Sequence, residues 1–157
     1  MRNLIMPIIS KTPFLREKLR QSLGITPNLE AGFLSGTPGK QNALGRLIPQ
    51  PLVANQSGHR AMLDTVLGMD FVAMGLDVDP RSVLTSAQQQ DWGKVGIRYV
   101  TVRSTHATPQ NDSDIVDFEN KLAPWFAESG SRVVVLRPDR FVAACGQASL
   151  DFPKLPG

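Results

Sequence analysis

Apolar residues in this chain gather in short runs separated by turns, from about Gly45 onward. The clearest run is Val133–Leu136, which is apolar and mostly β-branched, as is typical of a strand covered on both faces. The next four residues, Arg137–Arg140, contain Pro and Asp, which favour a tight turn. Phe141–Cys145 then returns as a second apolar run, so the pattern predicts a β-hairpin. A two-stranded ribbon is only marginally stable in water, so this hairpin must belong to a larger sheet.

The chain ahead of the hairpin predicts an alternation of strands and helices. In chain order we expect an extended segment at Leu47–Val53, a short strand running into a helical turn at Arg60–Gly68, a buried strand at Phe71–Leu76, a loop at Asp77–Thr85, a helix from Ser86 to about Trp92, an alternating strand at Ile97–Arg103 and a helical segment from Asp114 to Gly130.

Local signals set the expected ends of these elements. Ser86 and Gln89 have the spacing of a capping box, which predicts a helix start. Ile115, Phe118 and Leu122 fall on one face of a helix, which favours a helix from Asp114 that Pro124 interrupts or restarts.

The order of the predicted elements indicates the fold class. Strands joined by helices favour a parallel core to the sheet, and the hairpin adds an antiparallel edge. We therefore predict an α/β fold with a thioredoxin-like mixed sheet, flanking helices and a C-terminal β-hairpin. This domain should occupy residues 46–146, followed by a loose tail at 147–157.

Residues 1–45 are expected to form an irregular N-terminal arm ahead of the domain. A helix over about residues 13–23 is predicted, because Thr12 can cap it, Pro13 suits its first position and Gly24 can end it. Its leucines form one apolar stripe that needs a partner, and the linker after it is rich in Gly and Pro. The arm should therefore pack on another surface.

Composition and charge limit the function classes. The chain is 41% hydrophobic and 20% charged, and no apolar run approaches the ~20 residues needed to span a membrane, so no membrane partner is expected. Residues 1–60 hold eight Lys/Arg against two Glu (+6), and residues 61–157 hold nine against twelve acidic residues (−3). Aromatic residues are sparse in the basic part, so an acidic protein surface fits better than nucleic acid. A single cysteine fits a reducing, cytoplasmic location.

Candidate chemistry is sparse. Cys145 is the only thiol, so the C-x-x-C of a redox thioredoxin is absent, including from the loop Asp77–Thr85 where it would be expected. Cys145 is predicted to be a small core residue, while a thiol enzyme that pairs it with His59 or His106 remains an alternative. These residues have no metal-ligand spacing, so we assign no catalytic, cofactor-binding or metal-binding residue.

Two further motifs have plain structural interpretations. Gly36–Lys40 departs from a phosphate-binding loop in its glycine spacing and lacks Ser/Thr at the next position. Asp112, Asp114, Asp117 and Glu119 form an acidic cluster that would suit a solvated helix start. No G-x-G-x-x-G dinucleotide fingerprint is present.

Three segments together resemble a known family. Gly45–Val53, Leu63–Phe71 and Leu136–Val142 are similar to the C-terminal region of FAD-dependent aromatic-ring hydroxylases of the 3-(3-hydroxyphenyl)propionate hydroxylase and phenol 2-monooxygenase kind. The resemblance covers about residues 45–145. It implies a thioredoxin-like domain without redox cysteines.

The resemblance also implies that the catalytic parts lie on another stretch of polypeptide. FAD, NAD(P)H and oxygen insertion into a phenolic ring would belong to the full-length parent, and no cofactor is expected on this chain. The implied partner is the FAD-binding domain, and a homo-oligomer is expected through the arm. The alternative function is a free-standing, redox-inactive thioredoxin-like interaction module.

Overall fold

The computed structural model describes residues 34, 38–39 and 42–149. Its elements are β1 (Leu52–Ala54), β2 (Arg60–Met62), α3 (Leu63–Leu67), β3 (Val72–Leu76), the 3₁₀ helix η1 (Pro80–Val83), α4 (Ser86–Gly93), β4 (Arg98–Arg103), β5 (Asp114–Asp117), α5 (Leu122–Glu128), β6 (Val133–Leu136) and β7 (Val142–Gly146). The expected helix at 13–23, most of Gly36–Lys40 and most of the tail lie outside the described residues.

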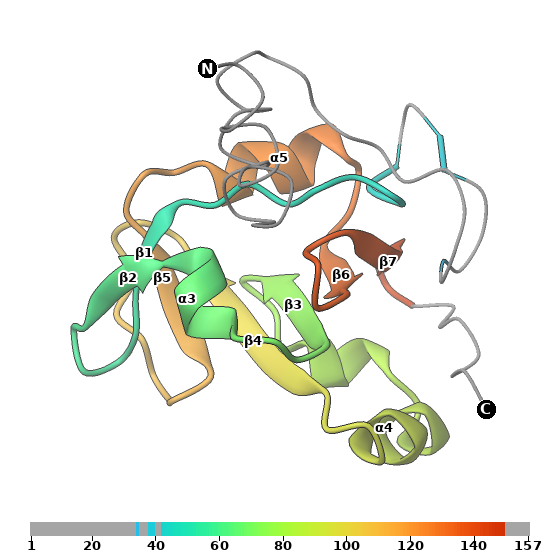
Figure 1. Cartoon of the computed structure of the whole chain (residues 1–157). Coiled ribbons are helices and arrows are strands. Elements are labelled where there is room, and N and C mark those ends of the chain that lie inside the picture. Colours follow the sequence, from blue (N-terminus) through green and yellow to red (C-terminus); the bar gives the residue numbers. More distant parts are fainter. Residues whose placement is uncertain (1–33, 35–37, 40–41, 150–157) are drawn as a thin grey trace, which may run out of the picture.

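One mixed sheet organises the described part of the chain (Figure 1). Its strand order is β2-β1-β5-β4-β3-β6-β7. Strands β3, β4 and β5 run parallel, while β6 pairs antiparallel with β3, and β7 antiparallel with β6. The predicted thioredoxin-like arrangement, with a parallel core and an antiparallel hairpin, is confirmed.

Side-chain alternation in the central strands explains why both faces of the sheet are covered. Val134 and Leu136 belong to the core cluster that also contains residues of α3 and α5. Val133 and Val135 belong to a second cluster with Trp92 of α4. Figure 1 shows α5 and α4 far apart, with the strands between them. The continuous apolar run predicted as a doubly covered strand is therefore confirmed.

The hairpin turn has an unusual residue at its end. Arg140 N donates to Arg137 O at 2.9 Å, which closes the predicted tight turn. Arg140 itself has φ 69°, a left-handed conformation that non-glycine residues rarely adopt. Outside the hairpin, Leu47 bridges to Phe141, so the segment ahead of β1 covers part of the free side of β7.

The predicted helix from Asp114 is wrong. Residues 114–117 form β5, which lies parallel to β4, with all four residues buried. The spacing of Ile115, Phe118 and Leu122 fitted a helical face, but Phe118 is 39% exposed and lies beyond the strand. Over four residues, the hydrophobic period of a strand (2) cannot be distinguished from that of a helix (3.6). Pairing with β4 therefore determines that residues 114–117 form a strand. The helix begins only at Leu122, with Pro124 in its first turn, where proline is tolerated.

Helix α4 begins near the predicted place but with a different cap. Thr85 Oγ1 accepts from Gln88 N, and Gln88 Oε1 accepts from Thr85 N, so the capping box sits one residue before the predicted Ser86 and Gln89 pair. Both pairs have the same spacing, and Thr85 has the extended backbone that a cap requires.

Among the described residues, no helix has the length and apolar character needed to cross a bilayer.

Candidate functional site

The loop after β3 occupies the place where a redox thioredoxin-like domain would carry its dithiol, and here it is folded tightly onto the sheet. Asp77 N donates to Val102 O at 2.8 Å, and Asp77 has φ 51°. A Cβ added to Gly75 would lie 2.2 Å from Val78 O, so only glycine lets the chain turn this closely over β3. The backbone of this loop is therefore fixed by direct contact.

Two charged groups of this loop, Asp79 and Arg81, satisfy each other. Arg81 Nε donates to Asp79 Oδ1 at 3.0 Å and Arg81 Nη2 donates to Asp79 Oδ2 at 2.8 Å, a bidentate pair. The side-chain hydrogen bond from Arg81 lowers the pKa of Asp79, and the same bond raises the pKa of Arg81. The Arg81 guanidinium also lies 5.6 Å from the ring centroid of Tyr99, whose pKa is raised by burial. With no thiol and its charges paired, the loop offers no reactive group of the redox kind.

Cys145 lies in β7, opposite Val134, partly buried against the core. His59 is exposed in the turn between β1 and β2, and His106 is exposed in the turn after β4. The thiol and the two histidines therefore stand on separate elements. The described residues contain no group of three or more His, Cys, Asp or Glu side chains placed to hold a metal ion.

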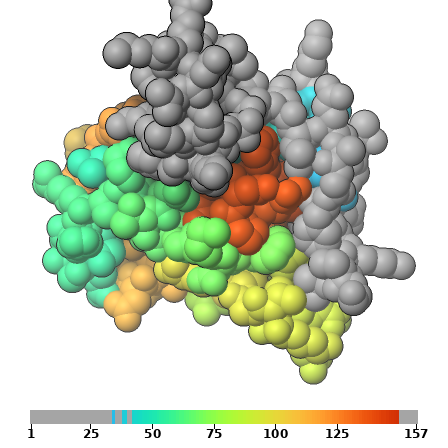
Figure 2. Space-filling view, viewed as in Figure 1, coloured from blue at the N-terminus to red at the C-terminus, as the bar shows by residue number. Residues whose placement is uncertain are grey.

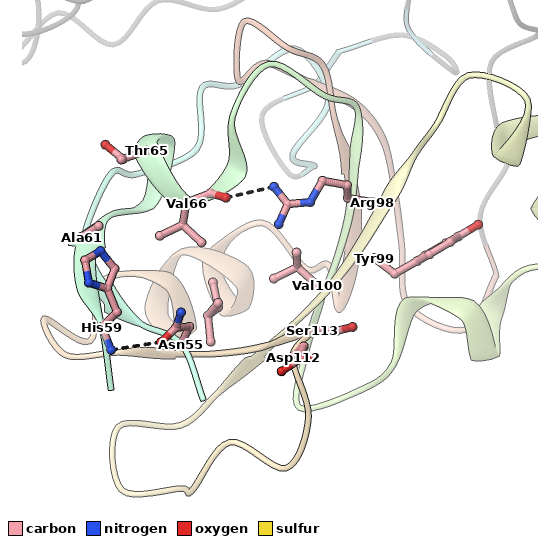
Figure 3. Close-up of a pocket in the computed structure, with 11 residues that line it drawn as sticks. Asn55, His59, Ala61, Thr65, Val66, Arg98, Tyr99, Val100, Asp112 and Ser113 are labelled. Carbon is pink, nitrogen blue, oxygen red and sulfur yellow. Dashed lines mark hydrogen bonds between the residues drawn. The ribbon is translucent and has the colours of Figure 1, made fainter. Parts of the chain in front are cut away.

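A hollow of about 490 Å³ lies between the β1–β2 turn, α3, β4 and the loop before β5 (Figure 3). Its apolar lining comes from Val66, Val100 and Ile115. His59 also lines it, but neither Cys145 nor His106 does. A thiol enzyme that pairs Cys145 with His59 would need both residues at one cavity. Cys145 does not line the hollow, so the hollow does not support the thiol-enzyme alternative.

Two polar side chains of the hollow, Arg98 and Asn55, have structural hydrogen bonds. Arg98 Nη1 donates to Val66 O and Leu67 O, both at 2.9 Å, so a cation satisfies the last carbonyls of α3. Asn55 Oδ1 accepts from His59 N at 3.0 Å, which closes the β1–β2 turn. In Figure 3 the Tyr99 side chain points away from the other labelled groups. Asp112, Thr65 and Ser113 also line the hollow, but among the described residues no hydrogen bond joins any of them to the His59 side chain.

The acidic cluster does not form a solvated helix start, so that expectation is wrong for its central members. Asp114 and Asp117 are 0% and 3% exposed. Asp114 Oδ2 accepts from Arg103 Nε at 3.2 Å, and Asp117 Oδ2 accepts from Leu122 N at 2.7 Å, at the start of α5. Exposed Glu119 accepts from Leu52 N at 2.6 Å, and this backbone hydrogen bond is the largest cause of its lowered pKa. These carboxylates tie strands and a helix together.

One charged residue that the sequence did not single out is Arg140. Its side chain is only 6% exposed, and its Nε donates to Asp64 Oδ1 at 2.6 Å on α3. In the sequence Arg140 is one of four turn residues, and Pro138 and Asp139 account for the turn without it. Its burial depends on packing between segments 76 residues apart.

Comparison with known proteins gives one family match over more than half of the chain. Residues 45–151 match the model of the family described as the HcaD C-terminal domain. This interval contains the three segments on which the resemblance rested.

Curated relatives match over a small part of their own length. A 3-(3-hydroxy-phenyl)propionate/3-hydroxycinnamic acid hydroxylase of Klebsiella pneumoniae (strain 342) is 33% identical over 121 residues, covering 73% of this chain and 22% of the relative. The enzyme of the same name from Burkholderia cenocepacia (strain HI2424) is 36% identical over 163 residues, covering 90% of this chain and 30% of the relative. The chain therefore spans less than a third of the length of these relatives.

A solved structure, the flavin-dependent monooxygenase PieE in complex with FAD and substrate, aligns with a TM-score of 0.45 and 19% identity. The alignment covers 74% of this chain and 21% of PieE, and a TM-score this low supports no argument here. The family match alone is decisive: the chain belongs to the HcaD C-terminal domain family.

Proposed function

We propose that this chain is the non-catalytic, thioredoxin-like C-terminal domain of a flavoprotein monooxygenase that hydroxylates phenolic aromatic compounds. The observation that carries the proposal is the family match at residues 45–151, which corresponds to less than a third of relatives named as hydroxylases. In this proposal FAD and NAD(P)H bind to the remainder of the parent polypeptide, and the protein works in the cytoplasm.

The described residues support a packing role. The loop after β3 has its charged side chains paired internally, and Cys145 stands in a strand apart from both histidines. The hydrogen bond from Arg81 lowers the pKa of Asp79, which makes this carboxylate a weaker general base. A rigid sheet covered on both faces is instead suited to hold a neighbouring domain or subunit.

A domain exchange tests the proposal. Residues 45–151 would replace the matching C-terminal region of the Burkholderia cenocepacia hydroxylase. We expect the hybrid to bind FAD and to hydroxylate 3-(3-hydroxyphenyl)propionate, whereas the relative truncated before this region should lose stability. A matched control carries Gly75→Ala in the transplanted part, which disturbs the fold without touching any proposed contact with flavin. A hybrid in which the transplanted domain is folded but no FAD is held would contradict the proposal.

Subunit association is the second part of the proposed role. We expect the isolated chain to self-associate through residues 1–45, because the predicted helix there has an apolar stripe without a partner in its own segment. Light scattering across a range of concentrations measures this directly. A monomer at every concentration, with and without residues 1–45, would remove association from the proposal.

A further inference from the structure

A buried cation on the hairpin turn keeps two donor nitrogens without a described partner. The Arg140 side chain is 6% exposed and uses only Nε, which donates to Asp64 Oδ1 at 2.6 Å. Its Nη1 and Nη2 are buried and have no hydrogen-bond partner among the described residues. Buried charged donors without partners are costly, so native proteins almost always satisfy them.

The backbone of Arg140 adds a second cost at the same residue. Its φ of 69° lies in the left-handed region, where glycine would be free of strain and arginine is not. Strain of this kind persists where the surrounding structure fixes the conformation, and strained residues cluster at functional sites. Glycine would relieve both the strained backbone and the unpaired guanidinium, so their retention together points to a role for the guanidinium itself.

A second unpaired polar atom lies on the segment that contacts the backbone of Arg140. Gln50 Oε1 is buried without a hydrogen-bond partner. The segment that carries Gln50 is joined to Arg140 on one side, since Ile48 N donates to Arg140 O at 3.2 Å. On its other side Leu63 N donates to Pro51 O at 2.9 Å, directly before Asp64. We call Arg140 and Asp64 the Arg140 corner. In the space-filling view, the red atoms of the hairpin lie beside the green atoms that follow β2 (Figure 2).

We propose that the Arg140 corner binds a carboxylate that no described residue supplies. The Nη1 and Nη2 atoms form a planar fork whose two parallel donors match the two oxygens of one carboxylate. Asp64 bonds the guanidinium through Nε and so fixes the orientation of this fork. Asp64 is 47% exposed, so its negative charge is partly solvated and leaves much of the buried positive charge available. This assignment does not depend on the proposed function.

The carboxylate has two possible sources with the same chemistry. The chain carries three side-chain carboxylates outside the described residues, namely Glu17, Glu30 and Asp151. A separate protein or small molecule could supply the group equally well. The two sources are separated by whether substitution within this chain or addition of a free carboxylate changes its stability.

Urea unfolding of the full 157-residue chain provides the test, with acetate as the probe and chloride at equal ionic strength as the reference. If the group comes from elsewhere, acetate should raise the unfolding midpoint of the unmodified chain. Arg140→Met and Arg140→Lys should both lose this response, since lysine keeps the charge but not the fork. Arg137→Met is the matched control in the same turn, and it should keep the response because Arg137 is paired with Asp139 at 2.7 Å.

If the carboxylate belongs to this chain, one variant among Glu17→Gln, Glu30→Gln and Asp151→Asn should lower the midpoint, and that loss should vanish in an Arg140→Met background. Circular dichroism in the absence of urea verifies that each variant folds. The proposal is overturned if acetate and chloride act alike and none of the three variants couples to Arg140. Asp64→Asn reproducing the whole effect of Arg140→Met would then identify the pair as purely structural.

Discussion

Two turns of this domain contain the same residue types, but their arginine side chains differ in burial and pairing. The loop after β3 contains Asp79-Pro80-Arg81, and the hairpin turn contains Arg137-Pro138-Asp139-Arg140. Each turn also holds one non-glycine residue at positive φ, Asp77 in the first and Arg140 in the second. In the first turn the Arg81 guanidinium is exposed and bidentately paired with Asp79. In the second turn Arg137 is paired with Asp139, but the Arg140 guanidinium is buried and bonded through one nitrogen.

This difference distinguishes a loop whose charged groups are paired internally from a surface that is available for binding. A loop that pairs its own charges, as Asp79 and Arg81 do, needs nothing from outside. A buried guanidinium with unpaired nitrogens is incomplete until another group arrives. In a thioredoxin-like domain the first place to look for function is the loop after β3, but here the incomplete site lies at the hairpin turn.

Gly75→Ala is expected to have the largest effect, because it breaks the closed loop. The new Cβ would lie 2.2 Å from Val78 O, and backbone atoms must move to make room. We expect a loss of about 3 kcal/mol in the free energy of unfolding, at the upper end for overpacking. Urea denaturation followed by circular dichroism measures it.

Gly93→Ala is the matched control for this substitution. Gly93 is the last residue of α4, and an added Cβ there would meet nothing within 4 Å. Alanine should leave stability unchanged or raise it by about 0.5 kcal/mol through the unfolded state. Equal losses at the two glycines would mean that the loop is not closed by contact at Gly75.

Thr85→Ala is expected to have the next largest effect, at the end of the same loop. The Thr85 hydroxyl accepts from Gln88 N at 3.2 Å, and its loss leaves this N–H at the helix start without its cap. We expect a loss of about 1 kcal/mol in thermal or urea unfolding. Ser86→Ala should change stability by less than about 0.5 kcal/mol. A larger loss of stability for Ser86→Ala than for Thr85→Ala would instead identify Ser86, the residue predicted from the sequence, as the helix cap.

The pH dependence of stability tests the pairing in the first loop. Because the folded pKa of Asp79 is lowered, chiefly by its hydrogen bond to Arg81, its contribution is present above the unfolded pKa. That contribution is lost as pH falls below the ordinary value of 3.8 and through the folded pKa. Asp79→Asn should therefore make the loss of stability in this acidic range shallower. An unchanged slope would show that the carboxylate is not held by Arg81 in solution.

Arg81→Met should have the smallest effect of the series. The Arg81 and Asp79 side chains are 50% and 45% exposed, so solvent screens their interaction. We expect a loss of about 0.5 kcal/mol or less. Lys94→Met, at an exposed pair with Asp91, should behave alike and serves as the reference in a thermal unfolding series. A much larger loss of unfolding free energy in Arg81→Met would contradict the view that the exposed Arg81–Asp79 pair contributes little to stability.

The sequence predicted those strands of the sheet whose hydrophobic pattern matches their burial in the structure. Val133–Leu136 is apolar at every position because it is covered on both faces, and the turn residues after it force the chain to return. The loop after β3 was likewise predicted to lack a redox dithiol, since a missing cysteine is visible in the sequence. These features depend on residues that are close together along the chain.

Features that depend on tertiary packing could not be predicted. Asp114 and Asp117 looked like solvent-facing acids, but Arg103 and Leu122 N bond them inside the fold. Nothing near Arg140 in the sequence indicates that Asp64 lies against it. The candidate site was therefore invisible in the sequence, although both elements that build it were predicted.

The absorption spectrum of the purified 157-residue chain shows whether this chain itself holds flavin. We expect a colourless protein, with no flavin absorbance after incubation with FAD and removal of the excess, and no NAD(P)H consumption with a phenolic substrate. A yellow protein that retains flavin in stoichiometric amount would contradict the assignment of the catalytic machinery to another part of a longer polypeptide.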